Sequence, residues 1–418
     1  MLLLFKSAAY RSFIVGAVSV SSACAISYST SYTPGIPGIK ESFDISSDTV
    51  VLLGLTTYML SLAFECLVFA SLSELYGRRP VYLITTLAFA CSVIPLALAR
   101  DIHTILVCRA LGGVFGSATI AGGPGTINDV TSRRYRALAF SLWSLGAMNG
   151  PAIGPIFGGF VYQYLGWRWI NWVILCRASV LAVALFLSKE TYELAILRAR
   201  ARTQQEQTGD LRWCLFWNLY VGVIYAILFL CFVSYPIAFQ EHRGWLPGIA
   251  GLGYCGIAPV SSSLFSVSPS SSAASSPVIR GTPARVRSPP RPPSVPYALG
   301  AILSPLGEFW FSWTAVATTT TAQSSSAPTY THWIYPILAG VSFGMVNTLI
   351  FIYSAHYLAG SYPIYAASAV ADNAMVRYVF AGALPLAGHR LYESMGIAWT
   401  GTLLGQVEVA LTPIPFVF

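Results

Sequence analysis

Repeated apolar runs of membrane-spanning length constrain this chain more than any other feature. A helix needs about 20 mostly apolar residues to cross the hydrocarbon core of a bilayer. Twelve windows of that kind occur in the 418 residues, at 12–32, 49–70, 81–99, 103–123, 139–162, 169–188, 213–235, 246–267, 297–316, 333–355, 363–387 and 394–416. The chain is also 55% hydrophobic and only 10% charged, whereas soluble domains carry about 25% charged residues. We therefore predict an all-α, multi-pass membrane protein.

The placement of Lys and Arg predicts how the windows cross the membrane, because cytoplasmic loops collect these residues. With the N-terminus in the cytosol, inner segments hold sixteen of the 24 basic residues, outer loops hold five, and three lie within spans. This asymmetry favours twelve helices with both termini in the cytosol. They form two six-helix halves, residues 1–188 and 213–418, joined by a cytoplasmic loop at 189–212.

The eighth window departs from this regular pattern. It contains Pro247 and Pro259 and runs into a Ser-, Pro- and Arg-rich tract at 258–296, and a second low-complexity patch lies at 317–330. Each Arg at the bilayer centre costs about 2.5–3.5 kcal/mol, so the tract belongs in water. We predict that the eighth span is defective and that 258–296 is translated intron or shifted frame.

Several function classes are not supported by the sequence. The eight cysteines contain no CxxC pair, which argues against a metal site or a disulfide framework. There is no phosphate-binding loop and no nucleophile, base and acid set at a recognised spacing, so we predict no enzyme and no cofactor. The net charge of +8 is spread over short loops, which argues against a nucleic-acid partner.

The short loop after the second window contains a compact charged motif. Glu74, Gly77, Arg78 and Arg79 stand together just before Pro80. They can form an ion-pair cluster that breaks when neighbouring helices move, which is how a gate works. The alternative is a basic turn that only sets orientation.

Two further motifs lie inside spans. Arg109 is an intramembrane guanidinium, so it should face the bundle interior and find an acceptor, either on a proton or substrate path or as a structural hydrogen-bond donor. In the fifth window glycines recur every four residues, at Gly146, Gly150, Gly154 and Gly158, with Pro151 and Pro155 between them. Such a stripe lets a second helix approach closely and predicts a hinge or a seal.

In this order, the motifs resemble those of the major facilitator superfamily, and more narrowly the fungal twelve-span drug:proton antiporters. The likeness extends to Trp167-Arg168-Trp169 before the sixth span and covers nearly the whole chain outside the two low-complexity tracts. It implies that the motif beginning at Glu74 is an inner gate, that Arg109 takes part in proton coupling, and that the span-5 stripe is the antiporter motif. Ala70 and Gly112 depart from the family pattern, which has Gly and Gln there.

The resemblance also implies a function. We expect a monomeric secondary transporter in the plasma membrane that exports small cationic or amphipathic compounds, such as drugs or polyamines, in exchange for protons. Its cavity would be lined by spans 1, 4, 7 and 10, which nominates Tyr28, Tyr225 and Asn347. The alternatives are a proton-coupled nutrient symporter and a non-transporting relative or faulty gene product. Glu308, in the middle of span 9, is either an acquired proton or cation site or a sign of damage.

Overall fold

The computed structural model describes residues 8–131, 135–187, 211–257, 294–316, 330–361 and 366–414. The described part of the chain is built of helices, apart from short turns and loops. The helices of the N-terminal half are α1 (Ala8–Thr30), α2 (Ile36–Phe43), α3 (Asp48–Tyr76), α4 (Arg78–Ala97), α5 (Ile102–Gly116), α6 (Ala118–Val130), α7 (Arg136–Leu165) and α8 (Trp167–Leu187). Those of the C-terminal half are α10 (Leu211–Pro236), η4 (Ile237–Glu241), α11 (Pro247–Leu252), η5 (Gly253–Gly256), α13 (Ser294–Thr314), α14 (Ile334–Ser361) and α15 (Ala366–Leu411).

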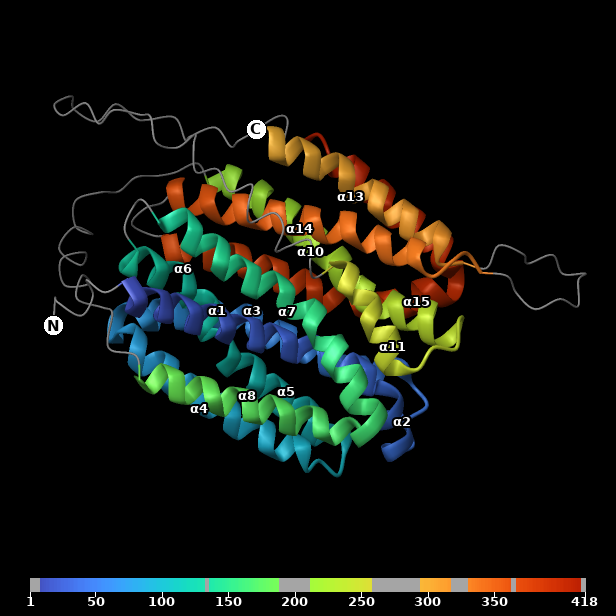
Figure 1. Cartoon of the computed structure of the whole chain (residues 1–418), viewed down its shortest axis with the longest axis horizontal. Coiled ribbons are helices and arrows are strands. Elements are labelled where there is room, and N and C mark those ends of the chain that lie inside the picture. The colour runs from blue at the N-terminus through green and yellow to red at the C-terminus, as the bar shows by residue number, and fades with distance from the viewer. Residues whose placement is uncertain are drawn as a thin grey trace, which may run out of the picture.

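The two halves of the chain form two groups of helices that lie side by side. In Figure 1 the blue-to-green helices fill the lower part of the molecule, and most yellow-to-red ones fill the upper part. Contacts between the halves come mainly from α3 against α15 and from α7 against α11. Within the halves, α1 packs on α7 and α10 packs on α15.

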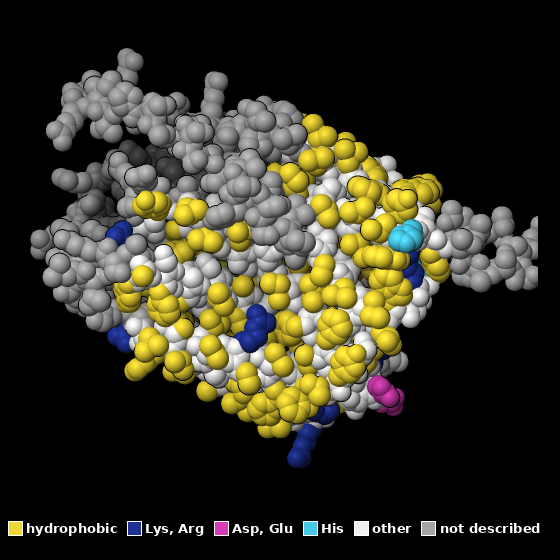
Figure 2. Space-filling view, in the orientation of Figure 1, with side chains coloured by type: hydrophobic (Ala, Val, Ile, Leu, Met, Phe, Trp, Pro, Cys, Tyr) yellow, Lys and Arg dark blue, Asp and Glu magenta, His cyan; other side chains and the backbone are white. Residues whose placement is uncertain are grey.

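The surface and the helix lengths fit a membrane. Seven helical segments of the described residues are long and apolar enough to cross a bilayer. Large apolar side chains such as Ile84, Val180 and Phe186 are more than 60% exposed, and the face seen in Figure 2 is largely hydrophobic, with few charged side chains. A lipid environment would cover such a surface, whereas water-soluble monomers rarely expose so much apolar area. The full number of twelve spans stays a prediction.

Three features differ in detail from the predicted windows. Span 4 is divided at Ser117 into α5 and α6, and α6 continues to Val130. Spans 11 and 12 follow each other without a loop, because the two helices within α15 meet at Gly396, where the backbone is non-helical with φ 75° and ψ 170°. The segment after α1 contains the short helix α2, which hydropathy did not indicate.

The eighth span is described only at its beginning. Helix α11 and the 3-10 turn η5 carry the chain to Ile257. Residues 258–293 and 317–329 lie outside the described residues. The predictions that this span is defective and that the tract is not native sequence therefore stay predictions.

Candidate functional site

Arg109 of α5 lies in a cradle of backbone carbonyl groups. Its side chain is 1% exposed. Nε donates a hydrogen bond of 2.6 Å to the Gly54 carbonyl of α3, and Nη2 donates bonds of 3.0 and 3.5 Å to the Ser29 and Tyr28 carbonyls of α1. These carbonyls are the acceptor that an intramembrane guanidinium requires. The side chain therefore ties α5 to α1 and α3.

Aromatic rings complete the surroundings of Arg109. Its guanidinium carbon lies 4.3 Å from the ring centre of Tyr32, 4.8 Å from that of Tyr28 and 5.3 Å from that of Tyr58. The negative faces of these rings stabilise a desolvated cation. Gly112, where the resembled family has Gln, leaves room for the Tyr28 ring, because a Cβ there would lie 3.2 Å from that ring.

The glycine stripe of α7 lies directly on the backbone of α1. A methyl group at Gly146 would be 2.5 Å from the Ser19 carbonyl oxygen, and one at Gly150 would be 3.0 Å from that of Ala23. One at Gly154 would clash with the Thr30 hydroxyl, which donates a 2.8 Å hydrogen bond to the Pro151 carbonyl of α7. A proline at 155 cannot donate to the Pro151 carbonyl as an ordinary helical residue would, so the Thr30 hydroxyl takes that place. The stripe thus allows a close approach of α1 within the N-terminal half, and its action as a seal or hinge stays a prediction.

The other side of α7 faces the C-terminal half. A Cβ at Gly159 would lie 2.5 Å from the Pro247 carbonyl oxygen, and one at Gly251 would lie 2.8 Å from that of Pro155. The Gly248 amide donates a 3.1 Å hydrogen bond to the side-chain oxygen of Gln163. One helix therefore carries close contacts to both halves, as a hinge or sliding element requires.

The predicted inner gate lies where α3 meets α4. Gly77 has φ 97° and ψ 157°, a backbone conformation that glycine adopts without strain. Arg78 is 2% exposed, and its Nη1 donates to the Gly122 carbonyl of α6 at 3.3 Å. Arg79 donates from Nη2 to the Phe186 carbonyl of α8 at 2.9 Å. Glu74 lies in the last turn of α3, and its side chain is outside the described residues.

The three nominated cavity residues share an unusual property. Tyr28 and Tyr225 are each 1% exposed and Asn347 is 5% exposed. The hydroxyl oxygens of both tyrosines and Nδ2 of Asn347 have no hydrogen-bond partner among the described residues. Buried polar atoms are normally paired, so unpaired ones indicate a role other than packing.

A second buried arginine, one of the three basic residues that the sequence places within spans, lies beside Tyr225. Arg377 of α15 is 1% exposed, with its guanidinium carbon 4.4 Å from the ring centre of Phe351, 4.9 Å from that of Tyr225 and 5.3 Å from that of Tyr378. Its position in mid-span was the available signal, but the sequence does not reveal which rings from other helices meet it.

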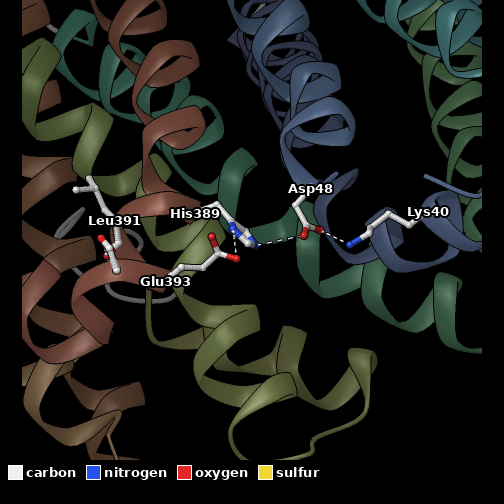
Figure 3. A network of polar contacts seen from close by, with 6 residues as sticks. Lys40, Asp48, His389, Leu391 and Glu393 are labelled. Atoms are coloured by element: carbon white, nitrogen blue, oxygen red, sulfur yellow. Dashed lines mark hydrogen bonds and ion pairs between the residues drawn. The ribbon is translucent and has the colours of Figure 1, made fainter. Parts of the chain in front are cut away.

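A polar network links the halves at one end of the bundle (Figure 3). Lys40 Nζ lies 2.6 Å from an Asp48 carboxylate oxygen, and the other Asp48 oxygen lies 3.7 Å from Nε2 of His389 on α15. Nδ1 of His389 lies 3.3 Å from Glu393. Sequence spacing does not reveal this network, because Asp48 and His389 stand in different halves of the chain.

Two buried carboxylates belong to another part of the C-terminal half. Glu308 of α13 is 4% exposed and Glu408 of α15 is 3% exposed. They lie within electrostatic reach of each other and of Cys231 on α10. Within the described residues, no group of three His, Cys, Asp or Glu side chains could hold a metal ion.

Comparison with known proteins places the chain among transporters. The model of the Major Facilitator Superfamily matches residues 18–385. The chain is 33% identical over 429 aligned residues to "Efflux pump FUB11" of Gibberella moniliformis (strain M3125 / FGSC 7600), covering 93% of this chain and 69% of that protein. It is 30% identical to "Multidrug transporter TPO1_2" of Candida glabrata, covering 93% and 70%. The solved human organic anion transporter MFSD10 shares the fold with a TM-score of 0.67 at 17% identity, covering 97% of this chain and 99% of that one.

Proposed function

The chain belongs to the major facilitator superfamily, and from that premise we propose that it is a proton-coupled exporter of small amphipathic compounds that works by alternating access. It is a multi-pass membrane transporter related to fungal efflux pumps and multidrug transporters, not an enzyme. In this proposal the two groups of helices rock against each other around substrate held between them.

The contacts of α7 carry the proposal of export. Its glycine stripe packs on α1, while Pro155, Gly159 and Gln163 contact α11 of the other half. A symporter of nutrients would not require the repeated Gly-Pro pattern that the drug:proton antiporters share. Smooth, tightly apposed backbone surfaces also suit small sliding movements between helices.

Arg109 and the charged clusters at the two ends complete the proposed cycle. Arg109 takes part in the coupling through its hydrogen bonds, which tie α5 to α1 and α3 and so link the positions of these helices, while the guanidinium itself stays protonated. Glu74, Gly77, Arg78 and Arg79 form the inner gate. The network of Lys40, Asp48, His389 and Glu393 (Figure 3) forms an outer gate, because it joins the loop after α1 and the start of α3 to α15.

The substrate class and the cellular setting are part of the proposal. Tyr28, Tyr225 and Asn347 contribute unpaired polar atoms to an otherwise aromatic surrounding, which suits an amphipathic molecule. Drug-like compounds fit this description better than polyamines, because the three nominated residues offer no carboxylate to hold a polycation. We place a monomer in the plasma membrane, with both termini in the cytosol and protons as the driving ion.

The test is transport by purified protein in liposomes with an imposed pH gradient. A fluorescent amphipathic probe should move against its own gradient only while the proton gradient lasts. Gly154→Ile should abolish movement, since the larger side chain meets Thr30 and Ser27, whereas Ile153→Ala, on the exposed side of the same helix, should leave it intact. Movement of probe together with protons would support the nutrient symporter instead. An inert but folded protein would support the non-transporting relative.

A further inference from the structure

We infer that Arg377 is the anchor of an anion subsite, so that compounds with a carboxylate on an aromatic or aliphatic body are preferred substrates. This inference rests on the proposed transport function and specifies what is carried. It concerns a cluster of Tyr225 on α10, Phe351 on α14, and Arg377 and Tyr378 on α15, called here the Arg377 cluster.

The guanidinium of Arg377 is desolvated but incompletely paired. It is 1% exposed, and its Nε and Nη1 atoms have no hydrogen-bond partner among the described residues. None of the ion pairs found in the described structure involves it. A buried charge with unfilled donor positions is costly, and an intramembrane arginine of this kind is a functional-site hypothesis by default.

The acceptor that fits is an oxyanion. Arginine presents a planar fork of N–H donors that matches a carboxylate in a bidentate arrangement. Each edge of the guanidinium offers two donors: Nε and Nη2 on one edge, and Nη1 and Nη2 on the other. The two unpaired atoms, Nε and Nη1, therefore lie on different edges. A carboxylate can bond either edge once the side chain rotates toward it.

Neighbouring groups supply additional hydrogen bonds to an anion. The hydroxyls of Tyr225 and Tyr378 are buried without a partner in the described structure, and each of these rings lies against the guanidinium. Asn347 stands one helical turn from Phe351 on α14, on the same face, and its Nδ2 is likewise unpaired. All of these groups can donate, as an anion requires.

The rings determine the rest of the ligand. Phe351 stacks near Trp143 of α7, with ring centres 5.7 Å apart, and Tyr225 lies 5.1 Å from Phe229. These apolar surfaces fit an aromatic or aliphatic body attached to the carboxylate. An inorganic anion would leave them without a contact.

Access follows from the position of the cluster between the halves. Tyr225, Phe351 and Arg377 belong to the C-terminal half, whereas Trp143 belongs to the N-terminal half and Tyr58 and Cys66 of α3 lie near Tyr378. Separation of the halves therefore removes the N-terminal cover from the cluster. Among the described residues, no ion pair joins Arg377 to the Glu308 or Glu408 carboxylate.

The experiment compares three probes of one shape: 1-naphthoate, neutral 1-naphthamide and 1-naphthylmethylammonium. Their binding to purified full-length protein in nanodiscs is measured by calorimetry. We expect naphthoate to bind at least tenfold more tightly than the amide, and the ammonium ion to bind most weakly. Equal affinity for all three, or tighter binding of the ammonium ion, would overturn the inference.

Variants test whether the preference for naphthoate arises at the Arg377 cluster. Arg377→Met should lower naphthoate affinity at least tenfold and leave amide affinity unchanged, which also reports that the variant is folded. Arg177→Met is the matched control, because Arg177 is another intramembrane arginine that lies over a ring, that of Phe157, at 5.0 Å. If Arg377→Met does not fold, Tyr225→Phe removes only a hydroxyl and should lower naphthoate affinity about threefold. Undiminished naphthoate binding by whichever of these variants folds would contradict the inference.

Two further measurements, competition by small anions and transport in liposomes, separate the anion subsite from the proposed transport function. Acetate or chloride that competed as strongly as naphthoate would show a small-anion site and overturn the substrate class. In liposomes, proton-driven movement of the ammonium probe without binding of naphthoate would leave the proposed transport standing and remove the anion subsite. Arg377-dependent binding of naphthoate without movement of any probe would support the subsite and count against export.

Discussion

The two buried arginines of this protein occupy similar surroundings but differ in their hydrogen bonds. Arg109 and Arg377 are each 1% exposed, and each guanidinium lies within about 5 Å of three aromatic rings. Arg109 donates to three backbone carbonyls of α1 and α3, whereas two nitrogen atoms of Arg377 have no partner among the described residues. The difference indicates that the first arginine holds helices together and that the second awaits a ligand.

Replacement of Arg109 should have the largest effect. Arg109→Met leaves the carbonyls of Gly54, Tyr28 and Ser29 without their donor, and hydrogen bonds to charged groups contribute about 1.5–3 kcal/mol each. We expect a lower unfolding midpoint and export below a tenth of the wild-type rate. Arg109→Lys should keep the charge but cannot reach all three carbonyls with one ammonium group. Its unfolding midpoint should therefore lie closer to the wild-type value than its export rate does. Wild-type export by Arg109→Met at equal membrane abundance would refute the coupling role.

The matching replacement of Arg377 should change stability in the opposite direction. Even a whole buried ion pair can often be replaced by apolar side chains with a neutral effect or a gain of about 1–4 kcal/mol, and a charge whose donors are incompletely paired offsets less of its desolvation cost than a pair does. We expect Arg377→Met to unfold at the same temperature as wild type or a higher one in thermal scans without ligand. A large decrease would mean that the guanidinium has a structural role like that of Arg109.

Removal of a hydrogen bond that joins α3 to α15 should have a smaller effect than replacement of either arginine. The Thr56 hydroxyl of α3 donates to the Gly382 carbonyl of α15 at 2.9 Å. Thr56→Val removes this bond, worth about 1 kcal/mol, and should shift the balance between the two arrangements of the halves several-fold. Distances between spin labels on α3 and α15 would report the shift. Thr85→Val is the control, because that hydroxyl bonds the Val81 and Tyr82 carbonyls within its own helix, α4; an equal shift there would contradict the prediction.

Among the links between the halves, the proposed outer gate of Lys40, Asp48, His389 and Glu393 should contribute least to stability and transport. Its side chains are partly exposed, and pairs of this kind stabilise by about 0–1 kcal/mol. His389→Gln should therefore alter the transport rate modestly and leave naphthoate affinity unchanged, since it is not part of the Arg377 cluster. His103→Gln, at an exposed position, should change neither quantity. Loss of naphthoate binding in His389→Gln would place substrate at the outer network instead.

The cap of the helix that carries Arg109 predicts a weak dependence of stability on pH. Asp101 accepts hydrogen bonds from the Thr104 hydroxyl and amide, which lower the pKa of its carboxyl below the ordinary value. A depressed pKa means that the carboxylate stabilises the fold at neutral pH and that this contribution is lost as the pH falls through that pKa. Asp101→Asn should lower the unfolding midpoint slightly at pH 7, and the difference from wild type should vanish in acid. A difference in unfolding midpoint between Asp101→Asn and wild type that did not change with pH would contradict this explanation.

Periodic and local features of the molecule could be predicted from the sequence, but contacts between distant segments could not. The glycine spacing in span 5 predicted the close approach of a second helix, which the structure identifies as α1, and the mid-span position of Arg109 predicted a buried guanidinium with an acceptor. That these acceptors are carbonyls of Gly54 and Ser29 depends on how α1 and α3 cross α5. The Arg377 cluster and the contact of Asp48 with His389 join residues from helices far apart in the chain. Their sequence spacing carries no signal of that proximity.

Thermal unfolding of Arg109→Met and Arg377→Met, in one detergent and with or without 1-naphthoate, tests the contrast between the two arginines most directly. The contrast predicts that Arg109→Met unfolds at a lower temperature than wild type and is still stabilised by naphthoate. Arg377→Met should unfold at or above the wild-type temperature and gain nothing from naphthoate. Equal losses of stability in both variants, with the same response to naphthoate, would contradict the assignment of a structural arginine and a ligand-binding one.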